Sequence, residues 1–308
     1  MKKKSSITAL ILLISWWTLQ ISPALAQDLE PRRWTPLPMG TNVIGIGYGR
    51  TTGDVIFDPV LEVENAKVEI DSLVVSYVRA FSLAGKLARF DAFLPSHNAR
   101  WEGLLSGEPA TVQRKGIADP VFRVSLNLMG APVAGPAELK KYMSSRSVNT
   151  VIGAAVSVQV PLGEYHEDKL LNLGQNRFTI RPQIGVVYSS GPWSYELTGS
   201  VFFFTDNNDF FNGKTREQEP LYTLQTHVVR RLKPGMWASL SAGYGRGGRS
   251  TINGVRKDDK KSNLLSAFSV GFPVTRKQGV KIAYVHGKTR TDTGADTESL
   301  VLGWSLLF

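Results

Sequence analysis

Hydrophobic and polar positions alternate along most of this chain, and the final segment shows the pattern most clearly. Its apolar positions share one face of an extended backbone and are Leu300, Leu302, Trp304, Leu306 and Phe308. Ser299, Gly303 and Ser305 fall on the opposite face. A period of two predicts a β-strand. One strand of a soluble sheet would show the same pattern, so the class of protein depends on how often the pattern recurs.

Eleven further segments repeat this alternation and predict strands. They are Thr41–Arg50, Val68–Ala80, Lys86–Leu94, Asp119–Met129, Thr150–Leu162, Arg177–Ser189, Trp193–Thr205, Leu221–Leu232, Met236–Gly247, Asn263–Val274 and Val280–Gly287. Strands of soluble sheets usually have about 5–6 residues, whereas a tilted strand that crosses a bilayer needs about 9–11. The lengths therefore favour an all-β transmembrane barrel of about twelve strands.

The connections alternate between tight turns and long polar loops. The tight turns are Ser82–Gly85, Ser190–Pro192, Lys233–Gly235 and Thr275–Gln278. The long segments are Thr51–Lys67, Pro95–Ala118, Gly163–Asn176, Asp206–Pro220, Gly248–Ser262 and Lys288–Thr297. This is typical of an antiparallel up-and-down barrel with short periplasmic turns, and an even strand count places both termini in the periplasm. Gly130–Asn149 is long for a periplasmic connection, and its Ala137–Tyr142 stretch is expected to form a short helix.

If the apolar face of each strand contacts lipid, the opposite face is polar and rich in arginine. The candidate lumen and selectivity residues are Arg89, Asp91, Arg123, Gln159, Arg177, Arg181, Gln183, Glu196, His227, Arg231 and Lys281. Two interpretations stay open: ion pairs that brace and partly fill the barrel, and a passage that selects solutes. About twelve strands predict a narrow or partly plugged lumen. For Val68–Ala80 the facing is ambiguous, because Glu69 and Asp71 share the parity of Leu73.

The first 26 residues resemble a signal peptide. Lys2, Lys3 and Lys4 precede an apolar run from Ile7 to Leu19, and an A-x-A cleavage site ends at Ala26. The predicted organisation is a signal peptide over 1–26, a periplasmic segment over 27–40 and an outer-membrane barrel over 41–308. The expected location is the outer membrane of a Gram-negative cell.

Composition leaves few catalytic options. The 308 residues include no cysteine and only four histidines, and the formal charge is +10. Thiolate chemistry and cysteine-ligated metals are therefore excluded, and no metal or cofactor is predicted.

The enzymatic alternative is an outer-membrane phospholipase, which needs a Ser–His pair on the lipid side. His227 is expected to face the lumen, His286 to lie near the outer rim, and His97 and His166 to lie in loops, with no serine evident beside them. We therefore predict that the protein is not an enzyme.

Several short motifs resemble an outer-membrane family. They are Pro31–Trp34, Leu37–Asn42, Phe57–Val60, Pro161–Tyr165, Asp168–Leu170, Arg177-Phe178, Phe203–Asn207 and Ser250–Val255. The family is labelled "putative MetA-pathway of phenol degradation", and its members are often described as transporters. The resemblance covers the chain from about residue 28 to its end. It implies a membrane β-barrel and a link to the catabolism of aromatic compounds, and it assigns no catalytic residue.

Together these observations predict an outer-membrane channel for passive uptake or efflux of small solutes, aromatic, hydrophobic or anionic. The alternative is a barrel that transports nothing and is structural or modifies lipids. Expected partners are membrane lipids, a small-molecule solute and, through the strand ending at Phe308, the barrel-assembly machinery. The basic run Arg256–Lys261 is assigned to lipopolysaccharide phosphates and not to nucleic acid.

Overall fold

The computed structural model describes residues 29–56 and 63–308 of the chain. The predicted signal peptide and the family motif at Phe57–Val60 lie outside these residues. No helix in the described ranges is long and apolar enough to cross a membrane.

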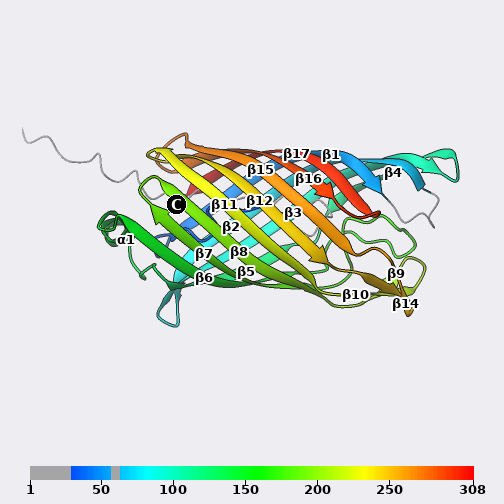
Figure 1. Ribbon diagram of the computed structural model, residues 1–308, viewed down its shortest axis with the longest axis horizontal. Coiled ribbons are helices and arrows are strands. Elements are labelled where there is room, and N and C mark those ends of the chain that lie inside the picture. The colour runs from blue at the N-terminus through cyan, green and yellow to red at the C-terminus, as the bar shows by residue number, and fades with distance from the viewer. Residues whose placement is uncertain (1–28, 57–62) are drawn as a thin grey trace, which may run out of the picture.

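Twelve long antiparallel strands form a closed barrel (Figure 1). In chain order they are β1 (Asn42–Ile56), β2 (Val63–Leu83), β3 (Lys86–Leu105), β5 (Val121–Met129), β6 (Val148–Gln159), β7 (Thr179–Ser190), β8 (Trp193–Phe204), β11 (Leu221–Lys233), β12 (Met236–Gly247), β15 (Lys261–Pro273), β16 (Gln278–Thr289) and β17 (Gly294–Leu307). Each strand pairs with the next, and β1 pairs with β17, so every barrel strand has two neighbours. The predicted fold and all twelve predicted strands are confirmed.

The outer surface of the barrel is apolar because alternate residues of each strand point away from the lumen. Ile184 is 60% exposed and Leu240 65% exposed, although both lie in the middle of strands. Aromatic side chains mark the ends of this band, with Trp193 and Tyr195 beside a short turn and Tyr222 near the outer end. An apolar band with aromatic borders is the lipid-facing surface of a transmembrane barrel.

The short turns lie at one end of the barrel, which we call the periplasmic end because outer-membrane barrels have their short turns there. The C-terminus and helix α1 (Pro136–Ser144) lie at the end that carries the short turns (Figure 1). Proline at the first helical position fits the start of α1, since a first-turn amide needs no partner within the helix. The tight turn between β2 and β3 uses positive φ angles at Ala84 and Gly85, as a two-residue hairpin requires.

The predicted outer loops contain more strand than expected. Most of Thr51–Lys67 belongs to β1 and β2, and Pro95–Ala118 forms the end of β3 and a further strand, β4 (Glu108–Ile117). Likewise β16 and β17 leave only residues 290–293 between them, not a long loop over Lys288–Thr297. The outer face of these extensions carries exposed polar residues such as Arg100 and Glu102, whereas Ala99 and Trp101 pack inward. The extensions therefore lack the apolar outer face by which the membrane-spanning strands were recognised.

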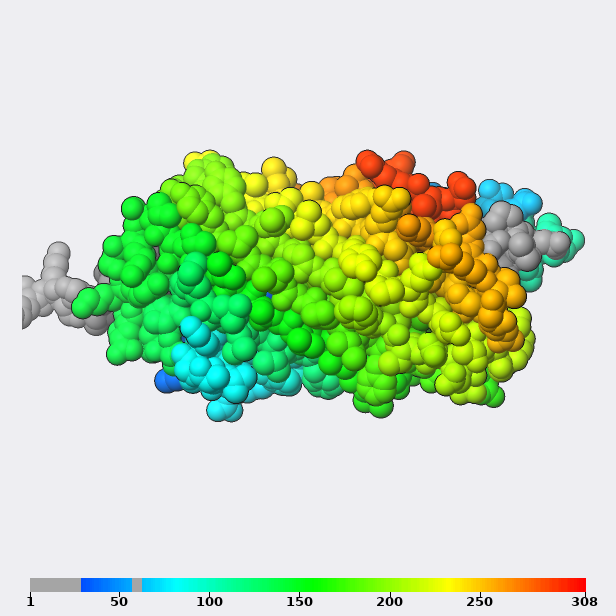
Figure 2. Space-filling model, turned by 60° about the horizontal axis from the view of Figure 1, so that its bottom comes forward, coloured from blue at the N-terminus to red at the C-terminus, as the bar shows by residue number. Residues whose placement is uncertain are grey.

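A small second sheet stands at the outer end. It consists of β9 (Asn207–Phe210), β10 (Lys214–Gln218), β13 (Ser250–Ile252) and β14 (Val255–Arg256), which come from two predicted loops. The space-filling view shows this yellow-to-orange region at the end opposite the green residues of α1 (Figure 2). Asn253 and Gly254 turn with positive φ between β13 and β14. The turn is local, but the pairing of β10 with β13 joins distant loops.

The inner surface carries the polar residues. The ambiguous facing of β2 is resolved: Val68, Ile70 and Val74 point inward and are nearly inaccessible, whereas Glu69 and Asp71 point outward. Glu69 and Asp71 pair with Arg50 near the outer end of β1. The inner face of β2 therefore carries mainly apolar residues, together with Ser72 and Ser76.

Candidate solute-binding lumen

The N-terminal segment enters the lumen from the periplasmic end and fills that half. Glu30, Arg33, Trp34 and Leu37 are each 5% exposed or less. The segment joins the wall through backbone hydrogen bonds near residues 39 and 40, where Gly40 N donates to Ala80 O at 3.0 Å. Within the described residues, the periplasmic half of the barrel is thus occupied by its own chain.

A buried network of ions holds this segment. Arg123 Nη1 lies 2.8 Å from Glu30 Oε2, and Arg123 Nε lies 2.8 Å from Asp91 Oδ2. Arg89 Nε reaches the second oxygen of Asp91 at 2.6 Å, and Arg33 reaches Glu30 at 3.2 Å. Burial opposes ionisation of Glu30, but Arg123 and Arg33 outweigh it, so the pKa of Glu30 lies below its usual range. Each carboxylate stays charged between guanidinium groups.

Trp34 anchors the segment by shape as well as by a hydrogen bond. Its indole Nε1 donates to Thr198 Oγ1 at 2.8 Å. The ring lies against Gly153 and Gly185 of adjacent strands, where a Cβ atom would lie 2.3 Å and 2.0 Å from ring atoms. Only glycine leaves room for the ring at these positions.

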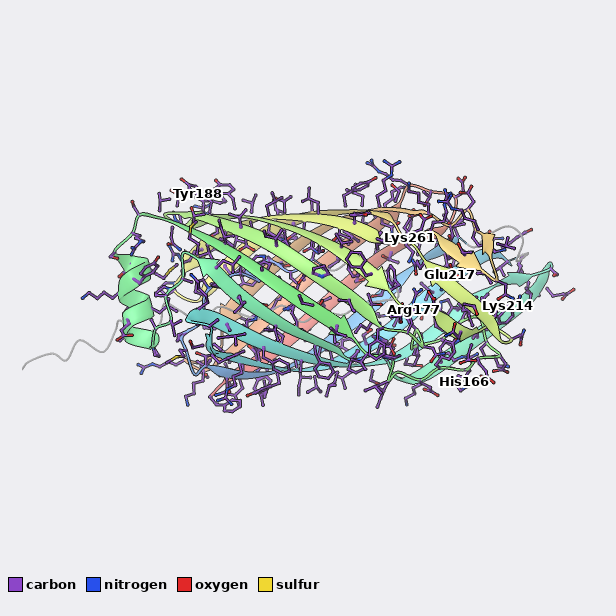
Figure 3. The ribbon with its side chains drawn as sticks, turned by 90° about the horizontal axis from the view of Figure 1, so that it is seen from below. His166, Arg177, Tyr188, Lys214, Glu217 and Lys261 are labelled. Atoms are coloured by element: carbon purple, nitrogen blue, oxygen red, sulfur yellow. The ribbon has the colours of Figure 1, made fainter. Side chains whose placement is uncertain are left out.

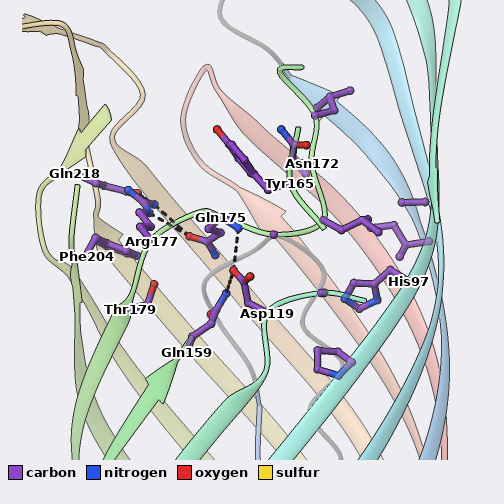
Figure 4. A pocket seen from close by; sticks show the side chains of 18 of the residues that line it. His97, Asp119, Gln159, Tyr165, Asn172, Gln175, Arg177, Thr179, Phe204 and Gln218 are labelled. Atoms are coloured by element: carbon purple, nitrogen blue, oxygen red, sulfur yellow. Dashed lines mark hydrogen bonds between the residues drawn. The ribbon is translucent and has the colours of Figure 1, made fainter. Parts of the chain in front are cut away.

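The outer half of the lumen contains a cavity of about 460 Å³. The connection between β6 and β7 folds into the barrel as one of its walls (Figure 4). Asp119 fastens this connection, because its carboxylate accepts hydrogen bonds from Gly163 N at 2.9 Å and Gln175 N at 2.8 Å. Gln159 donates a third bond to Asp119 at 3.1 Å.

Basic and aromatic side chains gather on the same side of this cavity. Among the described residues its lining includes four cationic side chains, namely Arg177, Arg181, Arg216 and Lys261, and two acidic ones, Asp119 and Asp259. Each of the three guanidinium groups lies over a phenylalanine ring: Arg177 over Phe204 at 4.6 Å, Arg181 over Phe202 at 4.4 Å, and Arg216 over Phe210 at 5.3 Å. Such stacking holds a planar guanidinium in one orientation.

The predicted lumen residues fall into four groups. Arg89, Asp91 and Arg123 belong to the periplasmic network; Gln159, Arg177 and Arg181 line the outer cavity; Gln183, Glu196, His227 and Lys281 are buried between them or beside the N-terminal segment; and Arg231 is exposed at the periplasmic rim. Arg231 has inward parity, but it lies beyond the lumen and donates to Gly191 O at 2.7 Å. Glu196 accepts a hydrogen bond from Arg32 N at 2.8 Å.

The sequence interpretation assigned Lys261 to lipopolysaccharide phosphates, whereas Lys261 lines the cavity, and it missed Glu30 and Arg216. Lys261 shares its parity with Asn263, so alternation could have placed it inward had the strand been extended by two residues. Glu30 and Arg216 lie outside the barrel strands, and no periodic signal could have placed them in the lumen. These residues reach the site through a terminal segment and a loop sheet.

Two histidines differ from expectation. His97 lies in β3 and not in a loop, and its Nδ1 lies 2.8 Å from Ser72 Oγ. His227 Nδ1 lies 2.8 Å from Ser241 Oγ, so serines do stand beside both histidines. These pairs form across neighbouring strands, which is why the linear sequence concealed them. All four residues are buried, on the inner face.

The closed barrel, its apolar outer band and its aromatic borders define an outer-membrane β-barrel protein. The family model described as "Putative MetA-pathway of phenol degradation" matches residues 49–298, and the chain belongs to this family. The resemblance noted in the sequence is confirmed. No curated protein matches the sequence.

Solved structures share the fold. The COG4313 outer membrane channel from Pseudomonas putida F1 is 20% identical, with a TM-score of 0.74 over 91% of this chain and 100% of that one. The transport unit of the autotransporter AIDA-I from Escherichia coli is 10% identical, with a TM-score of 0.52 over 92% and 94% of the two chains. The translocator domain of NalP from Neisseria meningitidis is 12% identical, with a TM-score of 0.50 over 88% and 90%.

Proposed function

We propose that this barrel is a channel that passes small organic solutes across the outer membrane by diffusion, with a preference for aromatic or anionic compounds. The observation that carries the proposal is the cavity of about 460 Å³ inside the barrel, lined by cations and aromatic rings. A structural barrel needs no such space, because packed side chains would stabilise it better. The family's link to phenol degradation and the channel described for the Pseudomonas relative support the same conclusion.

Passage through the periplasmic half requires the N-terminal segment to move. The segment is held by side-chain contacts and a few backbone hydrogen bonds, and it is not a strand of the barrel. It can therefore shift without opening the wall. The cavity and the segment together indicate a narrow, gated path and not a wide open pore.

An enzyme acting on lipids is the competing function, and the Ser–His pairs are its only support. His227 and Ser241 lie on the inner face beside the N-terminal segment, away from membrane lipid. His97 lines the cavity and its ring contacts Ser72, but no other side chain of the described residues hydrogen-bonds to the ring, so a third orienting group is missing there. The geometry favours hydrogen bonds that brace the wall.

The test is single-channel recording on the refolded full-length mature chain in planar bilayers. We expect discrete openings of small conductance that benzoate or phenol interrupts. A barrel that is folded yet silent at every voltage would contradict the proposal, and hydrolysis of phospholipid by the same preparation would favour the enzymatic alternative.

A further inference from the structure

We propose that the outer cavity contains a specific site for small aromatic carboxylates, in which Arg177, Arg216 and Lys261 bind the carboxylate and the apolar wall facing them receives the ring. This inference deepens the proposed function, since it names the solute that the passage recognises. The cavity volume of about 460 Å³ lies in the usual range for pockets that hold one small ligand.

Among the described residues, none of the three cations forms an ion pair at contact distance. In the described part of the chain, no carboxylate lies within ion-pairing distance of Arg177, Arg216 or Lys261. Arg177 donates instead to the neutral side chains of Gln175, at 3.3 Å, and Gln218. Arg177 Nη1 and Arg216 Nε are buried without any hydrogen-bond partner. Buried donors without partners are costly, and an entering carboxylate would satisfy them.

Three acids attract these cations from beyond ion-pairing distance: Asp206 and Asp119 attract Arg177, and Asp259 attracts Arg216 and Lys261. Asp259 and Asp119 are engaged in other hydrogen bonds. Asp259 accepts hydrogen bonds from Ser250 N, at 2.8 Å, and from Ser250 Oγ. Asp119 accepts the three bonds that fasten the inward-folded connection. Arg177, Arg216 and Lys261 are close enough to repel one another electrostatically. A bound anion would relieve this repulsion.

The wall facing the cations is apolar. Val68, Ile70 and Ala99 pack together there, and Val55, Trp101 and Leu173 pack against them. These side chains come from β1, β2, β3 and the inward-folded connection, whereas the cations come from the far side of the barrel. The close-up shows Arg177 and Phe204 on one wall and His97 on the facing wall (Figure 4).

This division selects one kind of solute. A planar ring gains from burial against the apolar wall, and a carboxylate gains charge-assisted hydrogen bonds from guanidinium and ammonium groups. A neutral aromatic alcohol lacks the second interaction, and a small aliphatic anion lacks the first. We therefore expect the site to require both groups in one molecule.

The first experiment is isothermal titration calorimetry on the full-length mature chain in detergent, with benzoate, benzyl alcohol and acetate as probes. Benzoate should bind at least about tenfold more tightly than either of the others, because each lacks one of the two interactions. Equal binding of benzoate and benzyl alcohol, or of benzoate and acetate, would overturn the proposal.

The second experiment removes one cation at a time. Lys261→Gln should weaken benzoate binding about tenfold and leave benzyl alcohol unchanged. Lys214→Gln is the matched control, because Lys214 is an exposed lysine of the same outer region that does not line the cavity. Figure 3 places Arg177 and Lys261 at one level of the barrel and Lys214 further toward the outer end.

Folding is checked by heat-modifiable mobility, and Arg216→Gln replaces Lys261→Gln if that variant does not fold. Arg216 lies in β10, outside the barrel wall, so its loss leaves the barrel pairing intact. Benzoate binding unchanged in the folded variant would refute the site.

The two proposals fail separately. If the barrel binds benzoate selectively but shows no channel openings, the binding-site proposal is supported and the channel proposal is refuted. If channel openings occur but benzoate does not bind saturably, the channel proposal is supported and the binding-site proposal is refuted.

Discussion

The two halves of the lumen use the same residue types in opposite ways. In the periplasmic half, Arg123 lies between Asp91 and Glu30, and the space is filled by the N-terminal segment. In the outer half, Arg177 and Lys261 face a cavity and have no carboxylate at ion-pairing distance among the described residues. Arginine thus braces the first region and is available to a solute in the second. Inward-facing arginine alone does not reveal which role it has.

The largest expected difference between the two halves is in how much stability is lost when an arginine is replaced. Arg123→Gln leaves Asp91 and Glu30 buried without their shared cation, which should reduce the free energy of unfolding by about 3–5 kcal/mol. Arg177→Gln removes bonds to neutral amides only, and its loss should stay near about 1 kcal/mol. Urea titrations of both variants in lipid vesicles measure the difference. Equal losses would show that the two regions do not differ in this way.

The next largest effect is expected when the close packing of Trp34 against glycine is disturbed. Gly185→Ala places a Cβ about 2.0 Å from Trp34 Nε1, so the ring must shift, at a cost of about 1–3 kcal/mol. We expect the N-terminal segment to loosen and the open probability in bilayers to rise. Gly199→Ala is the control, because no atom lies within 4 Å of its added Cβ. The same open probability in both variants would contradict the anchoring role.

The hydrogen bond of Trp34 should contribute less than its shape. Thr198→Val removes the acceptor of the 2.8 Å bond and should cost about 1 kcal/mol. A double-mutant cycle with Trp34→Phe isolates this bond, since phenylalanine keeps much of the ring and lacks the donor. A coupling energy near zero would assign the anchoring to packing alone.

The smallest expected effect is the change in ion selectivity when a charge at the periplasmic rim is removed. Arg181→Ser removes a cation of the outer cavity and should shift the reversal potential in a salt gradient toward cations. Arg231→Ser should shift it much less, because Arg231 is exposed and solvent screens its charge. Equal shifts would return Arg231 to the list of selectivity residues.

Strand positions were predictable where lipid lies on one side. Leu300, Leu302 and Trp304 alternate with small or inward residues because one face of β17 meets hydrocarbon and the other does not. The prediction weakened where the outer face of a strand meets water instead of lipid: β4 and the outer end of β3 were taken as loop. There, cross-strand hydrogen bonds and pairs such as Glu69 opposite Arg100 stabilise the strands.

Site residues were predictable only by parity. Arg177 and Arg181 could be placed inward from the alternation of the predicted strand Arg177–Ser189, but their stacking on Phe204 and Phe202 could not be read from one strand. The partner of Arg123 shows the limit more sharply. Glu30 precedes the barrel and meets Arg123 across 93 positions of sequence.

The sequence by itself determined a twelve-stranded outer-membrane barrel and the identity of most inward residues. These follow from a local rule: each residue of a spanning strand faces either lipid or lumen, and hydrocarbon rejects polar groups. Only the tertiary structure decided which arginines are paired and that Trp34 enters the barrel. It also decided that a cavity remains in the outer half of the lumen. Those outcomes depend on strand register and on how a terminal segment and distant loops return to the lumen, and no periodicity encodes such contacts.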